Sequence, residues 1–268
     1  MLKLKEKNGR FPTHIFVGVG KSASSWIWKN FTYHPEVFTP ATKEIHFFDN
    51  LNGNYFKGID WYKNNFITNK KVILEVTPNY FNTNCLNLIS TEISEVFILI
   101  CLRNPIYRAF SSWKFDRFIT GRKLNFIEFW NRNEGEVQTH GLYDEHLLTC
   151  MKKFKKEKVY LCFYDDIKKN PVKFLDNIFE FMKVQKIHHE VSNYRWMPGK
   201  ELFWNKTGIS NGDTKKRYDY YKNYFKNLKF SHEDWNILKN FYQKSILNLQ
   251  DLVNRNLSSW LEYKKEEE

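Results

Sequence analysis

The chain has 268 residues, of which 42% are hydrophobic and 27% charged, a balance typical of one large globular domain with a buried core. Its formal net charge of +12 favours an anionic partner such as a nucleotide, a polyanionic glycan, a nucleic acid or a lipid head group. Charge alone does not choose among these partners.

The cysteines and the apolar stretches argue against several classes of protein. The four cysteines include no C-x-x-C pair, which disfavours a zinc site and a secreted disulfide framework. No stretch approaches the roughly 18 apolar residues of a membrane helix, and the N-terminal residues 1–10 lack a signal peptide's apolar core. We therefore expect a cytoplasmic protein with no membrane span and no metal site, with residues 1–10 and 264–268 frayed.

The N-terminal part of the chain predicts a strand, a loop and a helix in succession. Residues 14–19 form a short apolar run rich in β-formers, which indicates a buried strand. A glycine- and serine-rich turn follows at 18–25. Residues 26–33 then read as a helix that ends before Pro35.

Three further strands and four further helices follow along the chain. Apolar runs predict strands at 72–76, 96–102 and 159–164. Helical spacing, or a cap followed by proline, predicts helices at 106–114 and 142–154, and helices that begin near Pro171 and at the capping-box pair Ser231 and Asp234. Apolar strands that alternate with helices indicate an α/β fold: a single domain over 1–268 with a central parallel sheet flanked by helices.

The turn after the first strand has the properties of a phosphate-binding loop. Ligands of open α/β sheets bind at the carboxyl ends of the strands, and small residues allow backbone N–H groups to approach an anion. The following helix contributes positive potential at its N-terminus, and Lys21 adds a full charge. An ordinary strand–helix turn with capping serines remains the alternative.

The same turn imitates the phosphate loop of NTPases without matching it. Gly20, Lys21 and Ser22 fit the end of the pattern G-x-x-x-x-G-K-[ST]. The first glycine of that pattern falls on Ile15, so the match fails.

A more specific resemblance covers this loop. Its residues Lys21-Ser22-Ala23-Ser24-Ser25-Trp26 resemble the 5′-phosphosulfate loop of the sulfotransferases that use 3′-phosphoadenosine 5′-phosphosulfate (PAPS), usually Lys-Ser/Gly-Gly-Thr-Thr followed by an apolar residue. Ala23 stands where that family has glycine and restricts the backbone more than glycine would.

The most specific motif comes after the third strand. Residues 102–112 are similar to the family's 3′-phosphate segment, in which an arginine and a serine eight positions later hold the phosphate; the matching residues are Arg103 and Ser111. Further segments resemble the heparan sulfate sulfotransferase branch and its bacterial relatives, or the family as a whole: 43–49, 77–81, 141–147, 164–171 and 256–261.

The resemblance implies a P-loop NTPase-like sulfotransferase fold, PAPS as co-substrate, PAP as product and no required metal. Lys21 would neutralise charge on the phosphosulfate bridge. The implied nucleotide-binding residues are Gly20, Lys21, Ser22, Ala23, Ser24, Ser25, Trp26, Arg103 and Ser111, and the basic run Lys215, Lys216 and Arg217 would correspond to a late loop over the 3′-phosphate or to a solvated charge run.

Two residues compete for the role of general base. The resemblance implies Glu44, which would accept the proton of the acceptor group. His46 is the rival, because cytosolic relatives use a histidine, although from a different segment. The alternatives are a structural ion pair of Glu44 with Lys43 or another cation, and a hydrogen-bonding role for His46. Lys43 would orient Glu44 or touch the acceptor.

The acceptor expected from the heparan-type motifs is a carbohydrate or glycoconjugate with a hydroxyl or an amine to be sulfated. The alternative enzyme class is a P-loop kinase or NTPase. The alternative without catalysis is a basic nucleic-acid-binding protein, although no helix-turn-helix, zinc finger or RNA-binding aromatic motif is evident. The oligomeric state is not indicated by the sequence.

Overall fold

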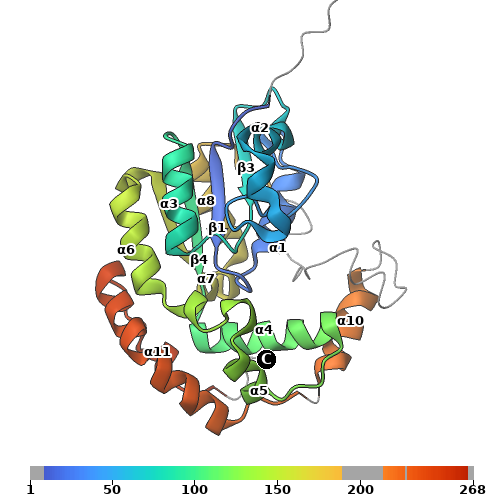
Figure 1. The fold of residues 1–268 in the computed structure, drawn as a ribbon, viewed down its shortest axis with the longest axis vertical. Coiled ribbons are helices and arrows are strands. Elements are labelled where there is room, and N and C mark those ends of the chain that lie inside the picture. Colours follow the sequence, from blue (N-terminus) through green and yellow to red (C-terminus); the bar gives the residue numbers. More distant parts are fainter. Residues whose placement is uncertain (1–8, 189–213, 227, 265–268) are drawn as a thin grey trace, which may run out of the picture. The chain divides into compact units, whose positions relative to one another are not determined.

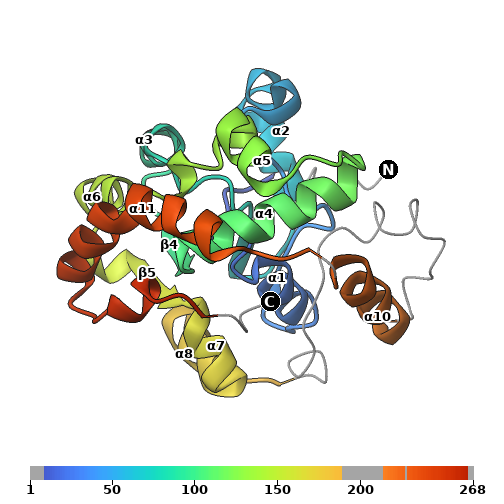
Figure 2. The same cartoon turned by 90° about the horizontal axis from the view of Figure 1, so that it is seen from below.

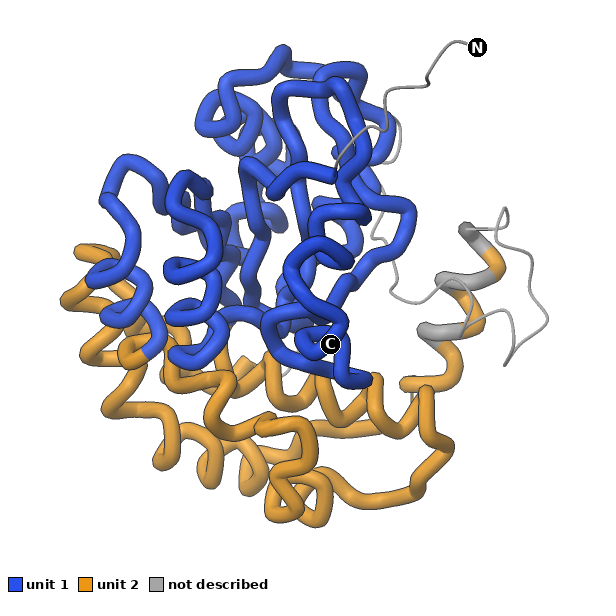
Figure 3. Tube along the Cα trace, turned by 45° about the horizontal axis from the view of Figure 1, so that its top comes forward, with its two compact units in different colours: residues 1–103, 146–196 blue, residues 104–145, 197–268 orange. Residues whose placement is uncertain are grey.

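The computed structural model describes residues 9–188, 214–226 and 228–264. The chain divides into two compact units, one made of residues 1–103 with 146–196 and the other of residues 104–145 with 197–268 (Figure 3). The expected single domain over the whole chain stays a prediction, and residues 1–8 and 265–268 of the expected frayed ends lie outside the described residues.

The described part of the first unit contains a parallel five-stranded sheet in the order β2-β3-β1-β4-β5. The four predicted strands are confirmed, and a two-residue edge strand joins them: β1 His14–Gly18, β2 Val37–Phe38, β3 Val72–Val76, β4 Phe97–Leu102 and β5 Val159–Phe163. Because all the strands are parallel, their carboxyl ends meet at one edge of the sheet.

Helices cover both faces of this sheet. Helices α1 (Ser24–Thr32) and α8 (Pro171–Met182) share one apolar cluster with side chains of the strands, among them Phe16 and Leu99. Helix α3 (Thr83–Glu92) lies over the opposite face (Figure 1). Strands buried on both faces explain the continuous apolar runs from which they were predicted.

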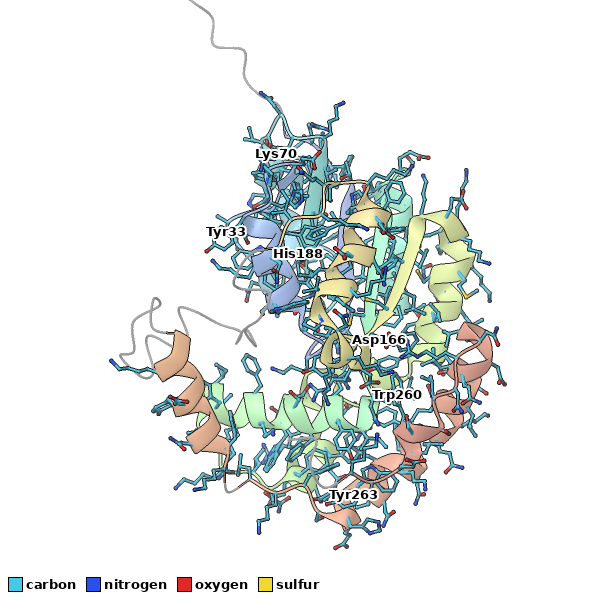
Figure 4. The ribbon with its side chains drawn as sticks, turned by 180° about the vertical axis from the view of Figure 1, so that it is seen from behind. Tyr33, Lys70, Asp166, His188, Trp260 and Tyr263 are labelled. Carbon is cyan, nitrogen blue, oxygen red and sulfur yellow. The ribbon has the colours of Figure 1, made fainter. Side chains whose placement is uncertain are left out.

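The edge of the sheet is held by a lysine. Lys70, labelled in Figure 4, donates from Nζ to the carbonyl oxygens of His34 and Val37 at 3.1 and 2.8 Å.

The last predicted strand is one residue too long, since Tyr164 begins helix α7 (Tyr164–Lys169). The first unit also has α2 (Ile59–Lys63).

Helix α6 (Tyr143–Lys153) crosses from the second unit into the first. Short 3₁₀ helices complete the two units: Leu51–Lys57, Asn64–Phe66, Glu134–Glu136, Thr139–Gly141, Lys156–Lys158 and Ser258–Leu261.

The second unit is helical in its described residues. Its helices are α4 (Pro105–Thr120), α5 (Phe126–Arg132), α10 (Thr214–Phe225) and α11 (His232–Val253), and α4 lies beside α11 (Figure 2). The capping box predicted at Ser231 and Asp234 is confirmed at the start of α11. None of the helices in the described ranges is long and apolar enough to cross a membrane.

Candidate active site

The loop between β1 and α1 turns sharply into the helix. Lys21 and Ala23 both have positive φ, 69° and 68°, and Ala23 caps α1 in the left-handed conformation. Helix α1 begins at Ser24, two residues before the predicted start, so Ser24 and Ser25 lie in its first turn and are buried. The first-turn backbone N–H groups of a helix have no partner within the helix, which makes this turn suited to an anion.

Hydrogen bonds tie the loop to its own turns and to the neighbouring strand. Ser22 Oγ donates to the carbonyl oxygen of Val19, and Val19 N donates to the carbonyl oxygen of Cys101 in β4 at 3.0 Å. The ring of Trp26 is buried in the apolar cluster with its centroid 6.0 Å from that of Phe174. Trp26 therefore anchors the start of α1 in the core.

Arg103, at the end of β4, lies against this loop. Its Nη1 donates to the carbonyl oxygen of Lys21 at 2.7 Å, and its guanidinium carbon lies 4.7 Å from the centre of the Tyr164 ring. Its side chain is buried, with 8% of the residue exposed. The two cationic residues singled out by the sequence are therefore adjacent at the carboxyl ends of neighbouring strands.

Gly20 of this loop borders open space, whereas Gly18 is closely packed. A Cβ placed on Gly20 would have no heavy atom within 4 Å, whereas a Cβ on Gly18 would lie 2.6 Å from Phe81 Cβ. Gly20 thus faces open space beside Lys21 and the first turn of α1. The donor set of backbone N–H groups, hydroxyls and a lysine suits a phosphate or a sulfate.

A chain of charged side chains forms a second cluster in the same unit. Lys43 Nζ lies 2.5 Å from Glu44 Oε1, and Glu44 Oε2 lies 3.2 Å from His46 Nε2. The other ring nitrogen, Nδ1, lies 2.7 Å from Asp49 Oδ2, which also accepts from Asn79 Nδ2 at 3.1 Å. The ion pair between Glu44 and Lys43, one of the sequence alternatives, is present.

These contacts set the protonation of the two candidate bases. Burial favours the neutral form of Glu44, but the charge of Lys43 and hydrogen bonds from His46 and Lys43 lower its pKa to about 2. Burial lowers the pKa of His46, but hydrogen bonds and charge from Asp49 and Glu44 outweigh it and raise the pKa to about 9. Glu44 is therefore anionic and His46 cationic at neutral pH.

Asp49 of this cluster, and two further residues of the first unit, were not assigned a role from the sequence. Asp49 and Tyr80 lie inside motifs that carried the resemblance, yet nothing in the motifs showed that Asp49 would bind His46 or that Tyr80 would hold the backbone of Phe47. Glu75 could have been recognised from the sequence, because it is an acidic residue in the otherwise apolar strand β3. Buried carboxylates require partners, so such a residue marks a polar network.

The remaining predicted nucleotide contacts lie in the second unit. Ser111 is half-buried in α4, and residues 215–217 fall in the first turn of α10, where the Lys216 side chain is exposed. Gly212, which precedes this run, lies outside the described residues. The grouping of Ser111 and the basic run with Arg103 stays a prediction. In the described ranges no three histidine, cysteine or acidic side chains are arranged to hold a metal ion.

The parallel sheet with a loop of small residues between β1 and α1 places the chain in the P-loop-like class of α/β proteins. A family model described as "Sulfotransferase domain" matches residues 12–261, and the chain belongs to that family. The family expected from the motifs is thereby confirmed.

Two similar proteins carry sulfotransferase names. Membrane-associated sulfotransferase kil1 of Dictyostelium discoideum is 27% identical over 59% of this chain and 34% of its own length. Bifunctional heparan sulfate N-deacetylase/N-sulfotransferase 1 of Caenorhabditis briggsae is 24% identical over 70% of this chain and 24% of its own length. The chain thus spans about a third or less of the length of these relatives.

Solved structures share the fold. A sulfotransferase from Alicyclobacillus acidocaldarius has a TM-score of 0.71 at 20% identity, covering 94% of this chain and all of the other. Mouse sulfotransferase SULT7A1, solved in complex with PAP, has a TM-score of 0.53 at 14% identity, covering 92% of this chain and 90% of its own. The predicted α/β fold with a parallel sheet flanked by helices is confirmed.

Proposed function

We propose that this chain transfers a sulfuryl group from PAPS to a hydroxyl or an amine of an acceptor, and that the acceptor is a carbohydrate or glycoconjugate. The observation that carries the proposal is the 2.7 Å hydrogen bond from Arg103 Nη1 to the carbonyl oxygen of Lys21. PAPS bears a phosphate on its 3′ side and a phosphosulfate on its 5′ side. Two cationic residues on neighbouring strand ends suit that pair of anions.

The names of similar proteins support both halves of the proposal. The mouse sulfotransferase of the same fold was solved with PAP, and the Caenorhabditis relative is named for heparan sulfate. Heparan-type glycans are polyanions, and the net charge of +12 on this chain favours such an acceptor.

The loop residues would bind PAPS, which supplies the sulfuryl group, and would offset its negative charge. First-turn N–H groups of α1 and the hydroxyls of Ser24 and Ser25 would hold the 5′-phosphate, while Lys21 offsets the negative charge that grows on the leaving oxygen. Arg103, held against the Tyr164 ring, would bind the 3′-phosphate, with Ser111 as its predicted second contact.

Glu44 is the better candidate for the general base. A cationic imidazole has no free lone pair, so His46 with a pKa of about 9 cannot accept a proton at neutral pH. Glu44 keeps its lone pairs, although its low pKa makes it a weak base while Lys43 and His46 bind it. His46 would orient the Glu44 carboxylate, and Lys43 would moderate its basicity.

Nucleotide binding tests the donor half of the proposal. We expect PAP to raise the melting temperature, because at 100 times its Kd it would add about 2.7 kcal/mol to the free energy of unfolding. ATP with magnesium, or an adenosine nucleotide that lacks the 3′-phosphate, should raise the melting temperature little. Lys21→Ala should reduce the PAP effect. Lys71→Ala, the same change at an exposed lysine before β3, should not. Stabilisation by ATP with magnesium and none by PAP would favour a kinase, and stabilisation by oligonucleotides alone a nucleic-acid-binding protein.

Transfer of labelled sulfate tests the chemistry. The panel contains an N-deacetylated heparan-type polysaccharide with free amines, an O-acceptor polysaccharide, a neutral oligosaccharide and a simple phenol. We expect label on a glycan and a loss in kcat of about 10²- to 10³-fold in Lys21→Ala. Label on the phenol alone would refute the glycan acceptor, and full activity in Lys21→Ala would remove Lys21 from its role.

A further inference from the structure

A buried carboxylate lies at the centre of a hydrogen-bond network in the first unit. Glu75 of β3 has no exposed surface. Tyr62 donates its hydroxyl to Oε2, Thr77 Oγ1 donates to Oε1 at 2.9 Å, and the hydroxyl of Tyr80 also hydrogen-bonds the carboxyl group. Each of these three partners is itself fully buried.

Two of the three hydroxyls also bind the backbone of the segment that carries Glu44 and His46. Ile45 N donates to Thr77 Oγ1 at 3.1 Å, and Phe47 N donates to the hydroxyl of Tyr80 at 2.7 Å. These two amides are on either side of His46, and Ile45 directly follows Glu44. The network therefore binds the backbone between Glu44 and His46 and again directly after His46.

The carboxylate of Glu75 determines which group donates in the hydrogen bonds of Thr77 and Tyr80. A hydroxyl has one proton, so a hydroxyl that accepts a backbone N–H uses its proton on another acceptor. In its ionised form the Glu75 carboxylate only accepts, and it then offers enough lone pairs for all three hydroxyl protons. Without it, the hydroxyls of Thr77 and Tyr80 would be left in the interior with protons and no acceptor, which is unfavourable.

We propose that Glu75 is a positioning residue of the active site, which fixes the backbone on both sides of His46 through Thr77 and Tyr80 and thereby orients Glu44. This inference rests on the proposed function, in which Glu44 accepts the acceptor's proton. Burial raises the pKa of Glu75 to about 7 against the hydrogen bonds of its three partners. A carboxylate is therefore a costly choice for a buried strand and is explained better by positioning than by stability.

Two tyrosines provide a matched test. Tyr62→Phe and Tyr80→Phe each remove one hydroxyl that binds Glu75 from a fully buried ring, but only the hydroxyl of Tyr80 also holds a backbone amide. Amide hydrogen exchange of the 43–49 peptide, the melting temperature and steady-state kinetics are measured for both. We expect Tyr80→Phe to speed exchange about tenfold or more and lower kcat about 10- to 100-fold, with the KM for PAPS within about twofold. Tyr62→Phe should leave exchange unchanged and kcat within about threefold.

Substitutions of Glu75 itself complete the test. Glu75→Gln keeps the shape but turns an NH₂ donor toward one of the hydroxyls, so exchange of the 43–49 peptide should rise and kcat fall. Glu75→Asp keeps an acceptor-only group, and we expect it to restore part of kcat. Wild-type kcat and exchange in Glu75→Gln would overturn the proposal, as would equal losses of kcat in the two tyrosine variants.

The exchange measurement separates this proposal from the proposed function. Faster exchange in Tyr80→Phe but not in Tyr62→Phe supports the positioning network whether or not sulfate is transferred. If PAP binds but the wild-type protein transfers no sulfuryl group to any acceptor, the proposed function fails and the link from Glu75 to catalysis fails with it. Unchanged exchange in Tyr80→Phe, in a protein that does transfer sulfate, overturns the positioning role alone.

Discussion

At the scale of single residues, the charge of His46 depends strongly on its neighbours. Its ring lies between two carboxylates, 3.2 Å from Glu44 and 2.7 Å from Asp49, and only 20% of the side chain is exposed. A cation between two anions is stabilised, so the folded protein binds the imidazolium proton more tightly than the unfolded chain does. The ion pairs of His46 are then a source of stability that depends on pH.

Replacing His46 tests this dependence. Because the folded pKa is raised to about 9, the stabilisation is fully present below the unfolded value of about 6.5 and is lost as pH rises through about 9. The melting temperature of His46→Asn should therefore fall furthest below that of the wild type near pH 6, and the gap should shrink by pH 10. A gap that stays constant across this range would show that the ring is neutral in the folded protein.

At the scale of elements, the β1–α1 loop places Ala23, which stands where the resembled loop usually has glycine, in a conformation that favours glycine. The residue caps α1 with φ 68° and ψ 18°, the left-handed conformation that costs a residue with a Cβ roughly 1–2 kcal/mol. Glycine avoids this strain, although it loses more conformational freedom on folding. The positive φ of Ala23 is therefore a strained conformation that a glycine at this position would adopt more readily.

Ala23→Gly should relieve that strain. We expect a gain in the free energy of unfolding of up to about 1 kcal/mol, because the relief exceeds the entropic cost of glycine. Chemical denaturation measures it. Ala109→Gly places glycine in the middle of α4, where the conformation is helical, and should lower the free energy of unfolding by about 1 kcal/mol or more. A loss of stability in Ala23→Gly as large as in Ala109→Gly would contradict the left-handed conformation of Ala23.

Gly18, the last residue of β1, and Gly20 of the following loop offer a second element-scale test. Gly18→Ala would place its Cβ 2.6 Å from Phe81 Cβ and should lower the melting temperature by several degrees. Gly20→Ala meets nothing within 4 Å, so it should melt within about 2 °C of the wild type but bind PAP about tenfold more weakly, since the new methyl group would occupy space for the phosphate.

Isothermal titration with PAP, beside the melting curves, distinguishes the two effects. Unchanged PAP affinity in Gly20→Ala would mean that the phosphate does not approach the backbone at this glycine.

At the scale of the whole molecule, the excess of positive charge is the property most relevant to the acceptor. The sequence has 42 lysines and arginines against 30 acidic residues. Long-range attraction of a polyanion is weakened by salt, whereas binding of a neutral sugar through hydrogen bonds is not. Salt therefore distinguishes a charged glycan acceptor from a neutral one.

The KM for a heparan-type acceptor should rise on the order of tenfold between about 50 and 500 mM salt. The KM for a neutral oligosaccharide that accepts label should stay within about twofold over the same range. Initial rates at saturating PAPS provide both values. Equal salt dependence of the two acceptors would show that the net charge does not contribute to acceptor binding.

The parts of the fold that could be predicted are those with a strong local pattern. Four strands were predicted because strands buried on both faces are continuous apolar runs. Strand β2 was missed because Val37–Phe38 is too short for any period to show. Helix α3 was missed as well, since its buried face of Cys85, Leu86 and Ile89 is embedded in polar residues.

The sequence by itself determined the family, the parallel α/β fold and the candidate residues Lys21, Arg103, Glu44 and His46, because motifs and buried strands are local patterns of residues. Only the tertiary structure decided which groups these residues meet. Arg103 reaches the carbonyl oxygen of Lys21 across 82 positions of the chain, and Tyr80 holds the backbone of Phe47 across 33. Such contacts, and the protonation states that follow from them, depend on distances and burial that arise only when the strands assemble into a sheet.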